Sequence, residues 1–253
     1  MAFDQSIALV TGTSSGIGAA LAESLLLNDW SVIGLARRGA PIRSSHYHHL
    51  EVDLGDLASL KDVAANQLQP MIADTPWRRV GLVNNAAMIG ALDGIEACDP
   101  EQLARIFAVN TVAPAFLMGM MSRIVEPTTC LRIVNVSSGA AGTAYPGLGA
   151  YGGSKAALRL AGMALAAELE SDERAGGPRP NAAILSYEPG VVDTAMQEET
   201  RSTSAAEFPW SQPFRDFASE GILAKPQEVI GEIVDFLSGD SEESFAEKRY
   251  GAD

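Results

Sequence analysis

A phenol and an ammonium group stand four residues apart in the stretch Tyr151-Gly152-Gly153-Ser154-Lys155. Residues four apart on a helix share one face, so the two side chains would be neighbours. An unperturbed tyrosine, with a pKa near about 10, is a poor acid–base group at neutral pH. Because a nearby positive charge favours the phenolate, we expect Lys155 to lower the pKa of Tyr151 towards the working range of a general acid.

A third polar group, Ser138, precedes Tyr151 by thirteen residues and ends a β-branched, apolar stretch. Its hydroxyl could hydrogen-bond a carbonyl oxygen and hold that oxygen beside the phenol. A serine at a strand end can equally cap a turn, and a Tyr/Lys pair at this spacing often arises by chance. The elements that would position these residues therefore decide the interpretation.

A glycine-rich turn lies near the start of the chain, between an expected strand and an expected helix. Such a turn lets the backbone approach a pyrophosphate, which then lies at the helix N-terminus. Three glycines can simply make a turn, but a strand before and a helix after are the context that dinucleotide binding requires. The expected phosphate contacts are Gly12, Ser14, Ser15, Gly16, Ile17 and Gly18.

The end of the second expected strand distinguishes the two nicotinamide cofactors. A carboxylate there would accept the ribose 2′-hydroxyl of NAD, but this chain has Arg37 and Arg38 instead. A guanidinium suits a 2′-phosphate, and Ser14 could add a hydroxyl. Two solvated arginines at a strand end are the alternative; the pattern favours NADP(H).

The remaining elements alternate between short β-branched runs and longer helical patterns, which indicates βαβ units and a parallel α/β sheet. The expected strands are 7–11, 31–36, 48–52, 80–84, 131–137 and 181–186. The expected helices are 17–27, 57–71, 100–124, 151–170 and 226–237. Between them, 194–221 is irregular and carries several aromatic residues, as a lid or binding loop would.

The turn Thr11-Gly12-x-x-x-Gly16-x-Gly18 together with Ser138, Tyr151 and Lys155 resembles the short-chain dehydrogenase/reductase family over nearly the whole chain. The resemblance implies a single-domain Rossmann fold over residues 1–253, with a doubly wound parallel sheet of about seven strands flanked by helices. It also implies hydride transfer from the cofactor to a carbonyl carbon, with Tyr151 donating the proton and Ser138 positioning the oxygen.

The same resemblance assigns roles to further residues. Asn110 would hold a water in a proton relay with Lys155, and Lys155 would also bind the cofactor ribose. Within the family, the stretches around Ser138, Tyr151 and Pro189 look most like the sepiapterin reductase and benzil reductase branch, which reduces vicinal dicarbonyls. The other cofactor contacts that it implies are Asp53, Leu54, Asn84, Asn85, Ala86, Tyr151, Lys155, Pro189, Gly190, Val192 and Thr194. Asp53, taken alone, could equally cap a turn.

A small carbonyl compound is the expected substrate, bound between the Ser138–Tyr151 segment and the lid at 194–221. Its expected contacts are Ser138, Tyr145, Tyr151 and Met196, each of which could instead be a packing residue.

The neighbouring His46, His48 and His49 suggest a metal, but adjacent strand residues point to opposite faces, so no metal site is expected.

Composition excludes several other classes of protein. A net charge of −14 argues against nucleic acid and anionic membranes, and no apolar run is expected to approach the length of a membrane span. Two cysteines are too few for a disulfide framework, which favours a reducing, cytoplasmic setting.

The family resemblance implies a homodimer or homotetramer joined through helices 100–124 and 151–170. An NAD-dependent alcohol dehydrogenase and a non-catalytic dinucleotide sensor stay open as alternatives.

Overall fold

The computed structural model describes residues 5–171, 181–204 and 208–252. Its centre is a seven-stranded sheet of order β3-β2-β1-β4-β5-β6-β7, in which every neighbouring pair is parallel. The expected single-domain Rossmann fold is confirmed. The strands are β1 (Ser6–Thr11), β2 (Ser31–Ala36), β3 (Tyr47–Glu51), β4 (Arg79–Asn84), β5 (Cys130–Val136), β6 (Asn181–Glu188) and β7 (Phe245–Arg249).

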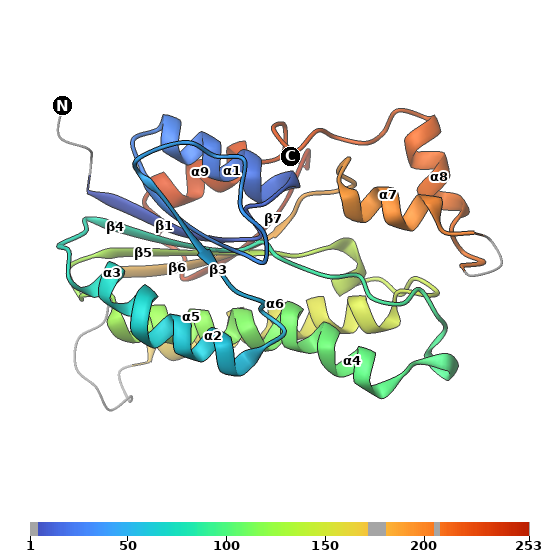
Figure 1. Cartoon of the computed structure of the whole chain (residues 1–253), viewed down its shortest axis with the longest axis horizontal. Coiled ribbons are helices and arrows are strands. Elements are labelled where there is room, and N and C mark those ends of the chain that lie inside the picture. Colours follow the sequence, from blue (N-terminus) through green and yellow to red (C-terminus); the bar gives the residue numbers. More distant parts are fainter. Residues whose placement is uncertain (1–4, 172–180, 205–207, 253) are drawn as a thin grey trace.

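Helices cover both faces of the sheet (Figure 1). One face carries α1 (Gly16–Leu27) and α9 (Gly231–Ser238). The other carries α2 (Leu57–Val63), η1 (Ala64–Leu68), α3 (Gln69–Ala73), α4 (Pro100–Phe107), η3 (Ala108–Val112), α5 (Ala113–Ile124) and α6 (Gly149–Glu170). The 3-10 turns η2 (Ile95–Ala97) and η4 (Gly139–Ala141) lie in the loops after β4 and β5.

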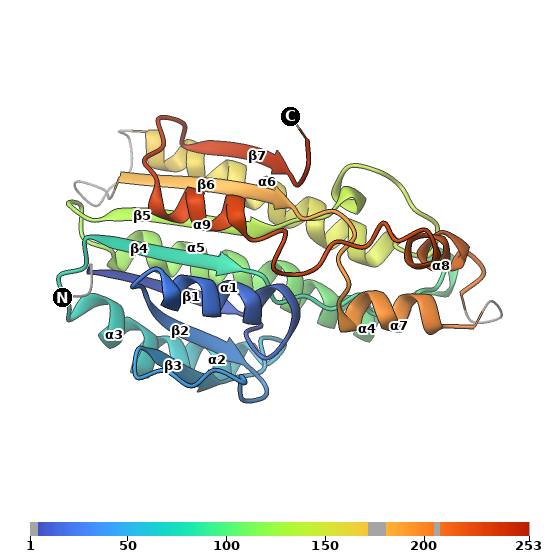
Figure 2. The same cartoon turned by 90° about the horizontal axis from the view of Figure 1, so that it is seen from above.

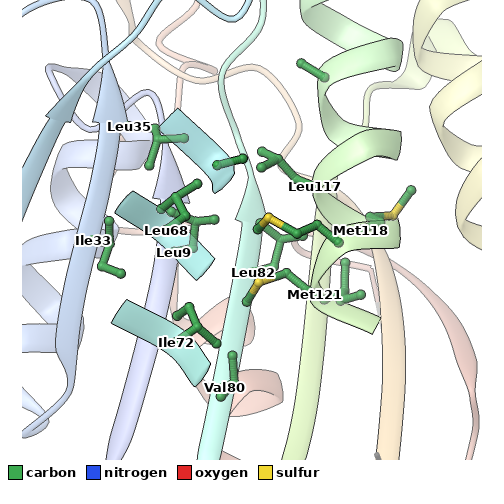
Figure 3. Close-up of a cluster of buried hydrophobic side chains, with 14 of the residues drawn as sticks. Leu9, Ile33, Leu35, Leu68, Ile72, Val80, Leu82, Leu117, Met118 and Met121 are labelled. Carbon is green, nitrogen blue, oxygen red and sulfur yellow. The ribbon is translucent and has the colours of Figure 1, made fainter. Parts of the chain in front are cut away.

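The apolar core lies on both faces, because parallel strands are buried on both sides. All six residues of β1 are buried. On the α5 face, Leu9 and Leu82 of the sheet pack with Leu117 and Met121 of α5 (Figure 3). This packing helps to hold the register of neighbouring strands, and the register decides which residues lie at the strand ends.

Two expectations about helices are wrong. The segment expected to be irregular contains α7 (Ala195–Ser202) and α8 (Gln212–Ser219), which lie past the carboxyl ends of the strands (Figure 2). Residues 205–207 of that segment lie outside the described part. The last helix begins at Gly231 and not at Pro226, because residues 226–230 form a separate turn, in which the Val229 carbonyl oxygen accepts a hydrogen bond from the Tyr187 hydroxyl (2.7 Å).

The continuous helix Pro100–Ile124 (25 residues) is, against expectation, long and apolar enough by length and composition to cross a membrane, with a mean hydropathy of 1.5 over its most apolar 18 residues. In the fold it lies against the sheet, and Leu117, Met118 and Met121 are buried in the core. Core helices pass the same test of length and hydropathy, so this is weak evidence for a span.

Candidate functional site

The expected site residues gather at the carboxyl ends of the central strands, the edge from which α7 and α8 extend (Figure 2). Ser138 follows β5, and Tyr151 lies in the first turn of α6 with Lys155 one turn later. In open parallel sheets this edge is where ligands bind, next to the point where the strand order reverses. That point is between β1 and β4 in this sheet.

Ser138, Tyr151 and Lys155 are brought together. The Lys155 ammonium lies 5.9 Å from the centre of the Tyr151 ring and donates a hydrogen bond to the Val136 carbonyl oxygen (2.6 Å). The Ser138 hydroxyl accepts a hydrogen bond from the Ala140 amide (3.2 Å), so it also caps the short turn η4. Ser138 is therefore a strand-end cap that also hydrogen-bonds the Tyr151 phenol.

The charges of these groups are set mainly by burial. Burial raises the pKa of the Tyr151 phenol, and a hydrogen bond with Ser138 opposes that rise. Burial also lowers the pKa of Lys155 to about 8. The expected lowering of the Tyr151 pKa by Lys155 is not seen, because the ammonium is directed at the Val136 carbonyl oxygen and loss of solvation dominates at the phenol.

Asn110 lies in η3, a π-helical turn in the middle of an otherwise α-helical segment. Its side chain is fully buried and bonds both backbone groups of Met88 (2.9 and 2.8 Å) and the Ser154 hydroxyl (3.0 Å). Ser154 in turn donates to the Tyr151 carbonyl oxygen (2.7 Å). Sequence reasoning missed Ser154, although its place inside the Tyr/Lys spacing was a signal. Asn110 thus ties the helix to the Tyr151 turn, and π-turns are frequent at functional sites.

The glycine turn is packed so tightly that it has no room for side chains at its glycines. Gly12 and Gly16 have positive φ values (77° and 59°), and a Cβ on Gly18 would lie 2.4 Å from the Gly12 carbonyl oxygen. The first turn of α1 has no acidic residue, and the Ser15 side chain makes no capping bond. The turn is therefore shaped for a close backbone approach, with helix amides available to an anion.

Thr11, part of the expected motif but not among the expected contacts, connects this turn to the end of β4. Its hydroxyl accepts hydrogen bonds from the Asn85 and Ala86 amides (3.0 and 2.9 Å), and the Asn85 side chain donates to the Thr11 carbonyl oxygen (2.8 Å). Asn84 instead bonds Asn135 of β5 (2.8 Å) inside the sheet. Asn85 and Ala86 thus adjoin the expected pyrophosphate site, whereas Asn84 joins two strands.

Arg37 and Arg38 are exposed after β2, and the described ion pairs include neither. Asp53 accepts a hydrogen bond from the Gly55 amide (2.8 Å) and pairs with Arg105 (2.9 Å). Burial alone would raise the pKa of Asp53, but these partners hold it below its usual value. Asp53 thus caps a turn, the alternative left open from the sequence, and the Leu54 side chain lies in the core.

The loop after β6 contains Pro189, Gly190, Val192 and Thr194, the expected contacts on the nicotinamide side. Gly190 has a φ of 72°, and Val192 forms a parallel bridge with Ala224. A Cβ on Gly16 would lie 3.3 Å from the Thr194 methyl carbon, so this loop approaches the glycine turn. The two expected cofactor segments therefore lie next to each other.

An apolar cluster adjoins Tyr151 on the expected substrate side. It consists of the buried residues Ile89, Leu92, Leu148 and Phe208, with Tyr151, Met196 and Phe214 packed against it. Phe208 is fully buried, and a Cβ on Gly147 would lie 2.5 Å from its ring. Tyr145, also an expected contact, is 48% exposed and lies outside the cluster. Met196 is therefore the better placed of these two substrate candidates.

Among the described residues, no group of three or more His, Cys, Asp or Glu side chains is placed to hold a metal ion. His49 instead contacts the Tyr47 hydroxyl (3.2 Å), which also contacts Thr13 of the glycine turn (2.8 Å).

This chain resembles known proteins in sequence and in fold. A family model described as short chain dehydrogenase matches residues 6–205. A benzil reductase ((S)-benzoin forming) of Bacillus cereus is 30% identical over 90% of this chain and 92% of its own length. Sepiapterin reductase of Bos taurus is 28% identical over 79% and 78%. A solved short-chain dehydrogenase/reductase of Saccharomyces cerevisiae superposes with a TM-score of 0.76 at 22% identity, over 98% and 96% of the two chains.

Proposed function

Because the chain belongs to the short-chain dehydrogenase/reductase family and is thus an oxidoreductase, we propose that it reduces a ketone or vicinal dicarbonyl to an alcohol with NADPH. The observation that carries this proposal is the placement of Ser138, Tyr151 and Lys155 at the sheet edge that also carries the glycine turn. The likeness to benzil and sepiapterin reductases supports a carbonyl substrate.

The glycine turn fits a dinucleotide, because its tight backbone depends on Gly12, Gly16 and Gly18 and leads into a helix whose first turn has no acidic residue and no side-chain cap. When bound, the cofactor would supply the hydride for the carbonyl carbon. Arg37, exposed and outside the described ion pairs, supports the choice of NADPH, since a guanidinium binds a 2′-phosphate that a carboxylate would repel.

The proton transfer would be carried out by Tyr151, Ser138 and Lys155. Burial raises the pKa of Tyr151, so its hydroxyl keeps a proton to donate to the carbonyl oxygen. Ser138 would hold that oxygen beside the phenol by a second hydrogen bond. Lys155 would restore the proton on Tyr151, and the apolar cluster around Phe208 would exclude water from the reacting carbonyl.

The direct test follows the consumption of NADPH with a panel of vicinal diketones and aromatic aldehydes, each repeated with NADH. We expect benzil-like diketones to be reduced, with NADPH clearly preferred. Equal or better use of NADH would overturn the cofactor assignment and favour an NAD-dependent dehydrogenase. NADPH binding without turnover of any carbonyl would favour the non-catalytic sensor.

The pH dependence of the reduction follows from the pKa of Lys155, which burial lowers to about 8. Below this pH the ammonium is charged and can pass a proton on, and above it the amine is neutral. Tyr151, whose pKa is raised, stays protonated over the same range. We therefore expect kcat/KM for reduction to fall as the pH rises through about 8. Lys155→Arg should remove this fall and lower kcat/KM at every pH, because a guanidinium keeps its charge but does not give up its proton; an unchanged fall in that variant would assign it to another group.

Phe208→Ala tests the apolar cluster, because emptying a fully buried aromatic position costs about 3–5 kcal/mol. The cluster joins the segment after η4 to the α7–α8 region, so we expect a higher KM for the dicarbonyl and an unchanged Kd for NADPH. Phe217→Ala is the matched control, since Phe217 contacts Phe214 but lies outside the cluster. Equal effects of the two variants on KM would contradict a special role for Phe208.

We further propose that the protein is a homo-oligomer joined through η3 and α6. These elements expose apolar side chains, Val112, Leu160 and Met163, of which Leu160 is 63% exposed. Leu160→Glu should shift the sedimenting species towards the monomer, whereas the same substitution at the exposed Leu27 of α1 should not. A wild-type chain that sediments as a monomer would overturn this part of the proposal.

A further inference from the structure

A cysteine lies between arginines at the amino ends of β4 and β5, the sheet edge opposite the candidate site. Arg79 of β4 is the strand neighbour of Cys130 of β5 and donates a hydrogen bond from Nη1 to the Cys130 Sγ (3.3 Å). Cys130 is a free cysteine that is partly exposed. Its sulfur therefore accepts a hydrogen bond from a cation at a place that solvent reaches.

Arg132, two residues further along β5, is a buried cation without a full set of partners. Its side chain is 0% exposed, and Nη1 bonds the Leu131 and Asn181 carbonyl oxygens (both 3.0 Å). Its Nε and Nη2 have no hydrogen-bond partner, and none of the ion pairs in the described part of the chain includes it. A guanidinium does not lose its proton in proteins, so its burial requires a compensating negative group nearby.

Cys130 is one of the groups that surround this charge. Burial lowers the pKa of Arg132, and the Cys130 side chain is the first neighbour that opposes this shift. The other charged neighbours are Arg79 and Asp240. Asp240 forms an ion pair with Arg79 (2.8 Å), and the Asp240 side chain is 90% exposed. Arg78 also acts on Asp240, so three guanidinium groups and one carboxylate surround this edge.

We propose that Cys130 is a nucleophilic thiol that exchanges with small anionic disulfides, and that Arg79 and Arg132 give it this reactivity. The Cys130 sulfur gives up its proton to solvent and attacks one sulfur of the disulfide. A new sulfur–sulfur bond forms, the original one breaks, and the second half leaves as a thiolate that takes up a proton. Cys130 is oxidised to a mixed disulfide, and one half of the reagent is reduced to a thiol. The positive edge attracts the anionic reagent to the sulfur.

The modification would act on α9, because Arg79 connects the two. Besides the Cys130 Sγ, Arg79 Nη1 bonds the Gly239 carbonyl oxygen (2.7 Å) just past the end of α9. A mixed disulfide on Cys130 displaces Arg79 from the sulfur and crowds this end of the helix. We therefore expect the modified protein to have a lower Tm than the unmodified protein.

The two cysteines of the chain make an internal comparison possible. Cys98 is also free and partly exposed, but its sulfur contacts the Asp99 backbone carbonyl oxygen (4.0 Å), whereas the Cys130 sulfur contacts a guanidinium. In Cys98→Ser and Cys130→Ser proteins, the rate of thiol release from dithiobis(nitrobenzoate), an anionic disulfide, gives the reactivity of each remaining cysteine. The guanidinium groups at this edge attract the anionic reagent to Cys130, so we expect Cys130 to react about three- to tenfold faster than Cys98.

Two further measurements distinguish the effect of the arginines on the Cys130 reaction rate from the effect of solvent exposure. Arg79→Gln in the Cys98→Ser protein should slow the reaction of Cys130 by a similar factor, and added salt should do the same to the parent. Dithiodipyridine, an uncharged disulfide, should show a smaller ratio of Cys130 to Cys98 rates in the single variants, which tests the charge without altering the arginines. Equal rates for the two cysteines, or the same ratio with both reagents, would overturn the proposal.

Discussion

Tyr151→Phe is expected to lower kcat for carbonyl reduction by about 10²- to 10⁴-fold, the range that general acid catalysis contributes. The substitution removes one hydroxyl and keeps the ring, which packs against the apolar cluster around Phe208. It also removes the hydrogen bond between Tyr151 and Ser138. The Kd for NADPH should change little, because the glycine turn and Arg37 are untouched.

The measurement pairs turnover with binding. NADPH consumption with a diketone gives kcat, and fluorescence titration of NADPH gives the Kd of the same preparation. Tyr250→Phe is the matched control, since Tyr250 lies on an exposed turn after β7. If Tyr151→Phe retained most of its turnover, or lost NADPH affinity in parallel with kcat, the phenol would not be the proton donor.

The parts of this site that could be located from the sequence are those whose positions depend on residue patterns within one strand or helix. The glycine turn, Ser138 and the Tyr151–Lys155 pair each lie at an end of a strand or helix that the hydrophobic pattern had already placed. Once β1 and β5 are parallel neighbours of β4, their carboxyl ends must meet at one edge. The chemistry was therefore readable from the spacing of residues within single elements.

The parts that sequence reasoning missed depend on contacts between distant segments. The pattern of 194–221 suggested a loop, yet α7 and α8 are held together by the Gln197 side chain, which donates to the Phe214 carbonyl oxygen (3.0 Å). Asp53 is paired with Arg105, which is far away in sequence. The direction of the Lys155 ammonium depends on the Val136 carbonyl oxygen at a strand end. A pattern within one element carries no information about such partners.

Arg37→Asp is expected to lower kcat/KM with NADPH by about 10- to 100-fold and to leave the value with NADH unchanged or higher. Hydrogen bonds to a charged group contribute about 1.5–3 kcal/mol, and each 1.4 kcal/mol is about a tenfold change. The new carboxylate would repel a 2′-phosphate but could accept a hydrogen bond from a 2′-hydroxyl. The sign of the change in cofactor preference is therefore the informative result.

Two comparisons make the result specific to position 37. Arg37 lies close enough to Asp53 to lower the pKa of that carboxyl, so a new aspartate there would also repel Asp53. Arg37→Ala removes the cation without this repulsion and should show the same preference at a smaller magnitude. Arg123→Asp makes the same change in net charge on α5, remote from the glycine turn, and should leave both cofactors unaffected. Equal losses with NADPH and NADH in Arg37→Ala would mean that the arginine supports the fold of the turn and does not distinguish the 2′-phosphate from the 2′-hydroxyl.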